Sequence, residues 1–172
     1  MAIVPVAASA EKADREKPTN IEADILVHDE LKQVSVFTGR AVLTRGSMVM
    51  RGSRIEMHED ADGYQFGVIF PEPGKRAFFR QKREGNDEFM EGEALRIEFD
   101  GKADRIKLID SAEVRRYRGP VLSDTMTGKL IIYENLTDMF SIDGQRSTEG
   151  GKAGSGRVKA VLAPRSKLLD KP

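Results

Sequence analysis

The chain has 172 residues, of which 39% are hydrophobic and 33% are charged, a composition typical of one soluble globular domain. Lysine plus arginine and aspartate plus glutamate both number 28, so no net charge would recruit a nucleic acid or an anionic membrane. The absence of cysteine excludes disulfides, thiolate nucleophiles and zinc-thiolate sites. No apolar stretch approaches the roughly 18 residues of a membrane-spanning helix.

The first ten residues, MAIVPVAASA, are apolar and end in small residues, the pattern that precedes a signal-peptidase cleavage site. We interpret this segment as the remnant of an export signal, with a disordered alanine-rich leader as the alternative. Residues 11–17 are a charged run without periodicity, which we expect to be solvated. Residues 1–17 are therefore predicted to precede the folded domain.

Beyond this leader the hydrophobic pattern has a period of two, as at residues 96–100, where charged and apolar residues alternate. Glycine, aspartate and proline turns separate these short segments at even spacing. The pattern predicts an all-β domain over residues 18–163, as a sandwich, a barrel or a jelly roll. Residues 150–156 are glycine-rich and predict a flexible link before a last strand, and residues 164–172 are predicted to form a flexible tail.

The strand pattern occurs twice in the chain. The first copy spans residues 22–57, and a looser second copy, over residues 93–133, begins about 71 residues later. Each copy gives several short strands between turns, which predicts two repeats that stack into one long sheet system. An extended sheet of this kind favours a surface that holds a ligand over a catalytic cleft.

Catalytic and metal-binding motifs find little support. His28 and His58 have no second histidine or cysteine at ligand spacing. Residues 58–63 place acidic residues before a glycine, as calcium loops do, but the first ligand position holds a histidine. Glu91 and Glu93 share one strand face and are the candidates for an acid pair in an enzyme acting on envelope glycans, but no partner across a cleft is evident. We predict no catalytic site, no metal and no cofactor.

Two basic clusters, at residues 76–83 and 115–118, combine cations with aromatic residues. Such clusters can bind nucleic acid through phosphate contacts and stacking. They can also form a solvated sheet face, or rim an apolar groove and meet the phosphates or acidic sugars of an amphiphile. Because the net charge is zero and acidic residues lie nearby, the solvated sheet face is the favoured interpretation.

Several segments, in order along the chain, resemble the OstA-like family of periplasmic lipopolysaccharide transport proteins, the LptA family. These segments are PTNIEAD at residues 18–24, FTGRAVLTRG at 37–46, GKRAFF at 74–79, Glu91-Gly92 with Ala94, and GKLIIY at 128–133. The resemblance covers residues 18–164, and its specificity lies in the ordered series. The export signal agrees with it independently.

The resemblance implies a twisted, open β jelly roll of about sixteen antiparallel strands, whose two sheets diverge into a V around an apolar groove. It implies a non-enzymatic periplasmic carrier that binds the lipid A acyl chains of lipopolysaccharide in this groove. Family members pair edge strands end to end into a bridge between the two membranes. The bridge receives lipopolysaccharide from an LptC-type inner-membrane protein and passes it to an LptD-type outer-membrane translocon. The alternative is a β-sheet scaffold of the cell envelope that binds only protein partners.

The alternation assigns thirteen residues to the inner face of the groove as lipid contacts. They are Ile21, Phe37, Leu43, Met50, Ile55, Phe79, Leu95, Ile97, Phe99, Leu108, Leu122, Ile132 and Phe140. Ile21, Phe79 and Phe99 match the lipid-facing positions of the family motifs best. A register slip of one residue would exchange Phe79 for Phe78. Methionines such as Met50 could adapt to acyl chains of variable shape, or could be ordinary core residues.

Overall fold

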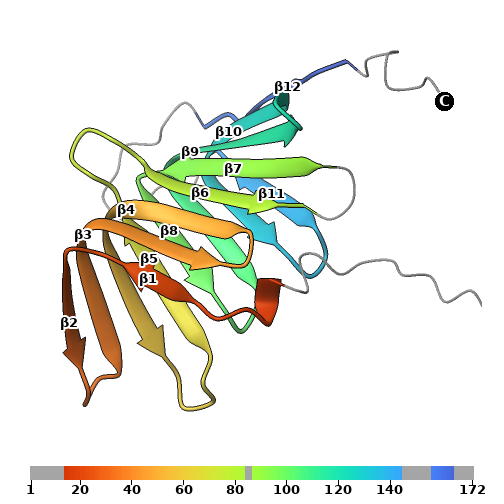
Figure 1. Ribbon diagram of the computed structural model, residues 1–172. Coiled ribbons are helices and arrows are strands. Elements are labelled where there is room, and N and C mark those ends of the chain that lie inside the picture. The colour runs from red at the N-terminus through yellow and green to blue at the C-terminus, as the bar shows by residue number, and fades with distance from the viewer. Residues whose placement is uncertain (1–13, 84–86, 145–155, 165–172) are drawn as a thin grey trace, which may run out of the picture.

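The computed structural model describes residues 14–83, 87–144 and 156–164, which form twelve strands in one antiparallel sheet and a helical turn near the N-terminus (Figure 1). The strands are β1 Asn20–Glu22, β2 Ile25–Asp29, β3 Val34–Arg45, β4 Met48–Glu59, β5 Gln65–Phe70, β6 Ala77–Lys82, β7 Glu88–Ala94, β8 Arg96–Asp100, β9 Arg105–Arg118, β10 Val121–Glu134, β11 Met139–Asp143 and β12 Lys159–Leu162. The predicted all-β fold is confirmed. The proposed export signal, most of the glycine-rich link and most of the tail lie outside the described residues.

Four long strands, β3, β4, β9 and β10, bend and divide the sheet into two leaves. The register of β3 against β4 shifts between Thr38 and Ala41, where Gly39 has a φ of 87°. In β9 the bend falls at Asp110 and Ser111, whose φ values are 62° and 49°. Such extra residues kink a strand and increase its twist. Each of the four long strands supplies one segment to each leaf. Counted in this way, the twelve strands give sixteen segments, the number that the resemblance implies for an open jelly roll.

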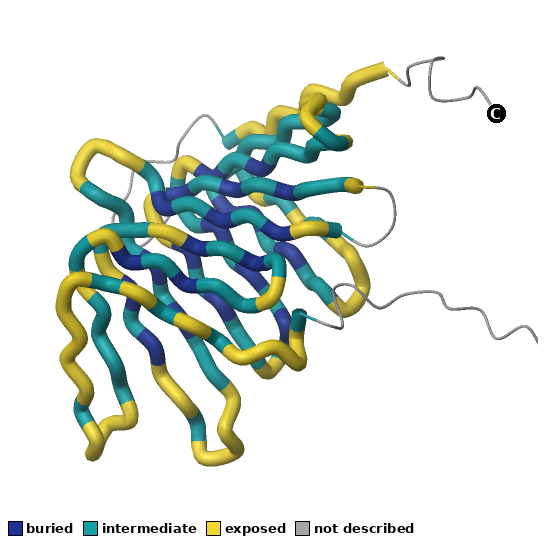
Figure 2. Tube along the Cα trace, in the orientation of Figure 1, coloured by how far each residue is buried: buried dark blue, intermediate teal, exposed yellow. Residues whose placement is uncertain are grey.

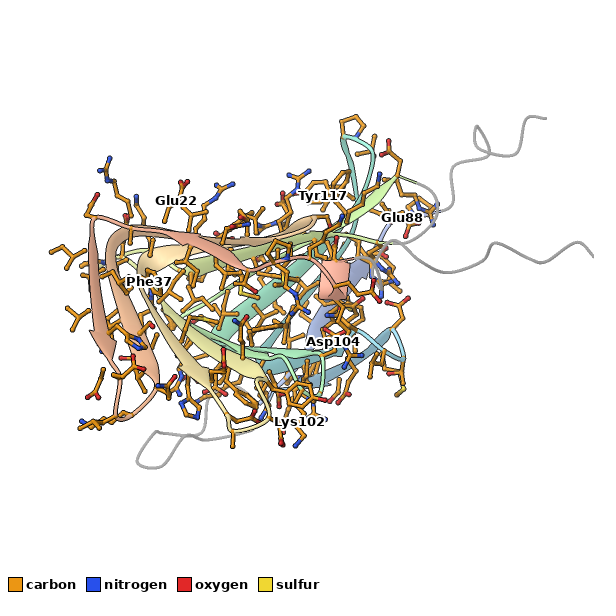
Figure 3. The ribbon with its side chains drawn as sticks, turned by 60° about the horizontal axis from the view of Figure 1, so that its bottom comes forward. Glu22, Phe37, Glu88, Lys102, Asp104 and Tyr117 are labelled. Atoms are coloured by element: carbon orange, nitrogen blue, oxygen red, sulfur yellow. The ribbon has the colours of Figure 1, made fainter. Side chains whose placement is uncertain are left out.

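The two leaves diverge from a spine formed by these bends. Leaf 1 contains β2, β5, β8 and β11, and leaf 2 contains β1, β6, β7 and β12, each with one half of every long strand. The turns at the far ends of the strands form the mouth opposite the spine. Figure 3 shows Glu22 and Tyr117 on the outer surface of leaf 2, with Phe37 and Asp104 toward the space between the leaves.

Strands β1–β6 and β7–β12 are two copies of one six-strand unit. β1 and β2 flank β3 as β7 and β8 flank β9, and β5 and β6 flank β4 as β11 and β12 flank β10. A backbone hydrogen bond at the spine repeats as well: Asp24 N–H donates to the carbonyl of Gly39 at 3.0 Å, and Leu95 N–H to that of Asp110 at 2.9 Å. The predicted duplication is confirmed, and the β5–β8 and β6–β7 pairings join the two copies.

The core lies between the leaves and is contributed by both. Figure 2 shows the buried positions along the middle strands, whereas β1, β2 and β12 at the two ends are largely exposed. Leu43, Met50 and Phe79 of leaf 2 and Ile55 and Ile97 of leaf 1 are fully buried. Burying a side chain of this size stabilises a fold by about 1.5–3 kcal/mol. The same apolar face therefore holds the two leaves together.

Within the charged run, Asp14 is half-buried and makes tertiary contacts, whereas residues 15–17 are exposed, as expected for a solvated segment. The Asp14 carboxylate accepts a hydrogen bond from Ser47 N–H at 2.9 Å, and its backbone carbonyl accepts one from Arg45 Nε at 3.2 Å. These polar tertiary contacts leave no trace in hydrophobic periodicity.

Candidate functional site

A row of apolar side chains crosses leaf 1 from one end of the molecule to the other. Its members are successive cross-strand partners on one face: Phe37, Ile55, Ile69, Ile97, Leu108, Ile131 and Ile142. A second row beside it contains Met57, Gly67, Phe99, Ile106, Tyr133 and Phe140. The two rows make the inner face of leaf 1 apolar across both repeats.

Leaf 2 carries the facing row. Its cross-strand partners are Ile21, Leu43, Met50, Phe79, Gly92, Val114, Met126 and Ala160. At Gly92 the leaves touch, because a Cβ atom there would lie 3.0 Å from Cδ1 of Leu108 on leaf 1. The interior is thus a narrow apolar layer that runs the length of the molecule.

The middle of this layer is filled by its own side chains, whereas the end formed by β1 and β2 is open. Phe79, Leu108 and Phe99 are at most 2% exposed. At the open end a cavity of about 250 Å³ is lined by Ile21, Phe37 and Met57 and by polar neighbours. A ligand that follows the apolar rows must therefore enter at such an end or separate the leaves.

Ten of the thirteen predicted inner-face residues lie on the inner rows, and three lie elsewhere. Leu95 is 46% exposed at the spine, where the chain crosses from leaf 2 to leaf 1. Leu122 is also 46% exposed and pairs with Tyr117 on the outer surface, because a register shift falls between Leu122 and Asp124. Ile132 pairs with the outward Lys107, because a second shift falls at the bend of β10. The inward placement of these three residues was wrong.

The inner face also contains residues that the predicted set left out. In the second repeat these are Ile106, Val114, Ile131, Tyr133 and Ile142, all buried or packed against the core. Gly128, at the bend in β10, was the sequence signal for the change of face, because glycine inside a strand often marks a bulge or sharp bend. Phe79 is fully buried while Phe78 lies on the outer face beneath Arg51, so the predicted register of β6 is confirmed.

The basic clusters lie largely on the outer face of leaf 2 as a lattice of ion pairs. Arg80 meets Glu91 at 2.9 Å, and Arg115 meets Glu93 at 2.8 Å and also pairs with Glu113. Burial opposes the charge of Arg115, but its hydrogen bonds to Glu93 and Glu113 outweigh this and raise its pKa. The favoured interpretation, a solvated sheet face, therefore fits the structure better than a nucleic-acid site.

The polar candidates of the sequence have ordinary structural partners. Glu91 and Glu93 both point outward into the arginine lattice and do not face each other across a cleft. The His28 ring shares hydrogen bonds with Ser35 Oγ at 2.8 Å and Glu30 Oε2 at 2.9 Å. Within residues 14–83, 87–144 and 156–164, no group of three histidine or acidic side chains is arranged to hold a metal ion. In the same part of the chain, no helix has the length and apolar character that crossing a bilayer requires.

The architecture is that of an open β jelly roll with an apolar interior, and the comparisons with known proteins agree. The family described as LptA/(LptD N-terminal domain) LPS transport protein matches residues 20–139. The chain belongs to this family.

Proteins similar to this chain include lipopolysaccharide export system proteins of three bacteria. LptH of Pseudomonas aeruginosa is 28% identical over 157 residues, covering 90% of this chain and 84% of that protein. LptA of Haemophilus influenzae is 25% identical, covering 95% and 87%, and LptA of Escherichia coli K12 is 26% identical, covering 96% and 81%. The crystal structure of LptH from Pseudomonas aeruginosa superimposes with a TM-score of 0.77 at 24% identity, over 88% of this chain and 99% of that one. This likeness confirms the fold.

Proposed function

We propose that this protein is a non-enzymatic periplasmic carrier that holds the acyl chains of lipopolysaccharide between its two leaves. The observation that carries the proposal is the set of apolar rows that run without a break through both repeats. Its relatives are named lipopolysaccharide export system proteins, and the matching structure is titled a periplasmic component of a lipopolysaccharide transport device. The ten inward residues of the predicted set, from Ile21 to Phe140, are the proposed lipid contacts.

The physical chemistry of an acyl chain suits such an interior. Each buried methylene contributes about 0.8 kcal/mol, so several chains can be held without covalent chemistry. The chains must displace side chains that now fill the layer, and Met50, Met57 and Met90 lie there. Methionine is unbranched and flexible, which lets it repack around a ligand of irregular shape. Binding is expected to begin at the open cavity beside Phe37.

The junction between the two repeats suggests how one molecule joins the next. Within the chain, β5 pairs with β8 and β6 pairs with β7. When the two repeats are compared, β11 and β12 at one end of the molecule are equivalent to β5 and β6. At the other end, β1 and β2 are equivalent to β7 and β8. We propose that β11 and β12 of one molecule pair with β2 and β1 of the next, which forms a bridge of like subunits.

The internal register predicts the contacts of this junction. The pair Ile69–Ile97 corresponds to Ile142 of one molecule and Leu26 of the next, so the inner apolar row continues across the junction. The outer pair Phe78–Glu93 corresponds to Lys159 and Glu22, which have opposite charges.

The exposed ends support this pairing. Ile25, Leu26 and Val27 on β2 are 56–62% exposed, and Val161 and Leu162 on β12 are 56% and 69% exposed. Unpaired edge strands that expose apolar side chains are templates for a further strand. An LptC-type protein and the N-terminal domain of an LptD-type translocon are the proposed partners at the two ends, since the family includes the LptD N-terminal domain.

A scaffold that binds only proteins is the second candidate, and the closed middle of the interior favours it. Phe37→Asp separates the two functions, because Phe37 is only partly buried and lines the cavity. As a carrier, the variant should bind purified lipopolysaccharide at least tenfold more weakly, since an unpaired carboxylate would meet the acyl chains. The neighbouring Val36→Asp changes the outer face and should bind normally. Equal binding by both variants and the unaltered protein would favour the scaffold.

A further inference from the structure

Three arginines of leaf 2 reach across the mouth of the V to leaf 1. The Arg45 guanidinium lies over the ring of Phe99 at 5.5 Å, and that of Arg116 over the ring of Phe140 at 4.9 Å. Arg83 pairs with Asp138 in the turn between β10 and β11. Cations thus line the mouth, which is the long side of the apolar layer opposite the spine.

Most of the polar atoms that this fold buries without a partner lie along the same mouth. Five such side-chain atoms occur among the described residues, and four of them are Gln81 Oε1, Arg83 Nε, Arg116 Nε and Asn135 Oδ1. Gln81 is only 3% exposed. A buried polar atom without a hydrogen bond destabilises a fold, so a group of them calls for a ligand or another compensation. Two are donors and two are acceptors, a mixture that a phosphorylated sugar can satisfy.

The N-terminal turn supplies an anion at this mouth. The Asp14 carboxylate accepts hydrogen bonds from both the backbone N–H and the hydroxyl of Ser47. Arg45 donates to the backbone carbonyls of Asp14 and Arg15, and no described carboxylate forms an ion pair with it. Burial lowers the pKa of Arg45, although Asp104 partly opposes this. Asp14, Arg45 and Gln81 line one small space between the leaves.

We propose that the mouth binds the phosphorylated sugar head of a lipid, through Arg45, Ser47, Gln81, Arg83, Arg116 and Asn135, and that the Asp14 turn occupies part of this site in the free protein. The inference rests on the proposed function, because the head is placed at the mouth by acyl chains lying on the inner face. A phosphate would displace the Asp14 carboxylate and accept the hydrogen bonds that the Ser47 N–H and hydroxyl now donate to it. The phosphate would also form an ion pair with Arg45. Sugar hydroxyls donate to the open acceptors of Gln81 and Asn135.

The test compares lipid A that carries both phosphates with the same lipid after removal of both, by equilibrium binding to the full chain. Arg45→Gln should weaken binding of the phosphorylated lipid about tenfold and leave the dephosphorylated lipid unchanged, because a charge-assisted hydrogen bond is lost. Asp14→Ala should strengthen binding of the phosphorylated lipid several-fold, because it removes the competing carboxylate. Arg96→Gln is the control, since Arg96 pairs with Glu98 on the outer face.

The possible results distinguish failure of the head-group site from failure of the carrier function. If the unaltered protein binds both lipids equally, or Arg45→Gln weakens both alike, the head-group site is wrong while the apolar groove stands. If neither lipid binds, both proposals fail. Should Arg45→Gln unfold the protein, Arg116→Gln is the second substitution. If both Arg116→Gln and Asp14→Ala kept the unaltered protein's preference for the phosphorylated lipid over the dephosphorylated one, the site would also be overturned.

Discussion

Phe78 and Phe79 are adjacent in the chain and lie on opposite faces of β6. Phe79 is fully buried opposite Met50 and Gly92, whereas Phe78 lies on the outer face with the Arg51 guanidinium 5.0 Å from its ring centre. Because successive side chains of a strand point to opposite faces, one ring lies in the interior and the other on the outer surface. It also provides a matched comparison, because the two substitutions remove the same atoms.

Phe79→Ala should lower the free energy of unfolding by about 3–5 kcal/mol, because it leaves a cavity between the leaves. Phe78→Ala should cost about 1–2 kcal/mol, the loss of a partly exposed ring and its contact with Arg51. Urea denaturation of both variants measures the difference. A larger loss for Phe78→Ala than for Phe79→Ala would mean that β6 is shifted by one residue, and equal losses would contradict the assignment of the two rings to opposite faces.

The strands at the two ends of the sheet differ from those within it. β12 is exposed at every residue and pairs only with β10, and β2 is exposed at four of its five residues and pairs only with β3. The equivalent inner strands, β6 and β8, pair on both sides. The end strands therefore expose apolar side chains and lack a second neighbour, which favours pairing with the edge strand of another molecule.

The proposed junction predicts that Lys159→Glu will weaken self-association about three- to tenfold, because Lys159 would face Glu22 of the next molecule. The double variant Lys159→Glu with Glu22→Lys should restore it. Light scattering against concentration follows the assembly. Lys107→Glu, which changes the net charge equally in the middle of the sheet, should have no effect. A protein that is monomeric at all concentrations, or a double variant that is no better than the single one, would contradict the register.

Alternation in the sequence was enough to place Ile97 and Phe99, because β8 is short and straight and its faces follow from local chemistry. It failed for Leu122 and Ile132, because each lies beyond a register shift that exchanges the faces. The shifts arise from pairing between strands far apart in sequence, so local pattern alone does not fix their position. The docking of Asp14 was missed for a related reason, since it depends on a hairpin turn more than 30 residues away.

In the whole molecule, duplication makes the apolar interior longer, because the second repeat continues the inner rows of the first. The same pairings build each repeat, and the same kind of pairing joins the repeats, so the inner rows cross the junction at Ile69 and Ile97 without a change of chemistry. The mouth opposite the spine is lined by cations, and the outer face of leaf 2 carries its own compensating ion pairs. A lipid with apolar chains and an anionic head fits this division of surfaces, and a globular protein partner does not require it.

The most direct test of the carrier function is photo-cross-linking in cells from position 99, compared with position 98 on the same strand. Phe99 lies on the inner face and Glu98 on the outer one, so a photoreactive residue at each site samples the two surfaces of β8. We expect a lipopolysaccharide adduct from position 99 and none from position 98. Equal labelling from both positions, or no adduct from position 99 and from other inner sites such as 37 and 55, would contradict the account.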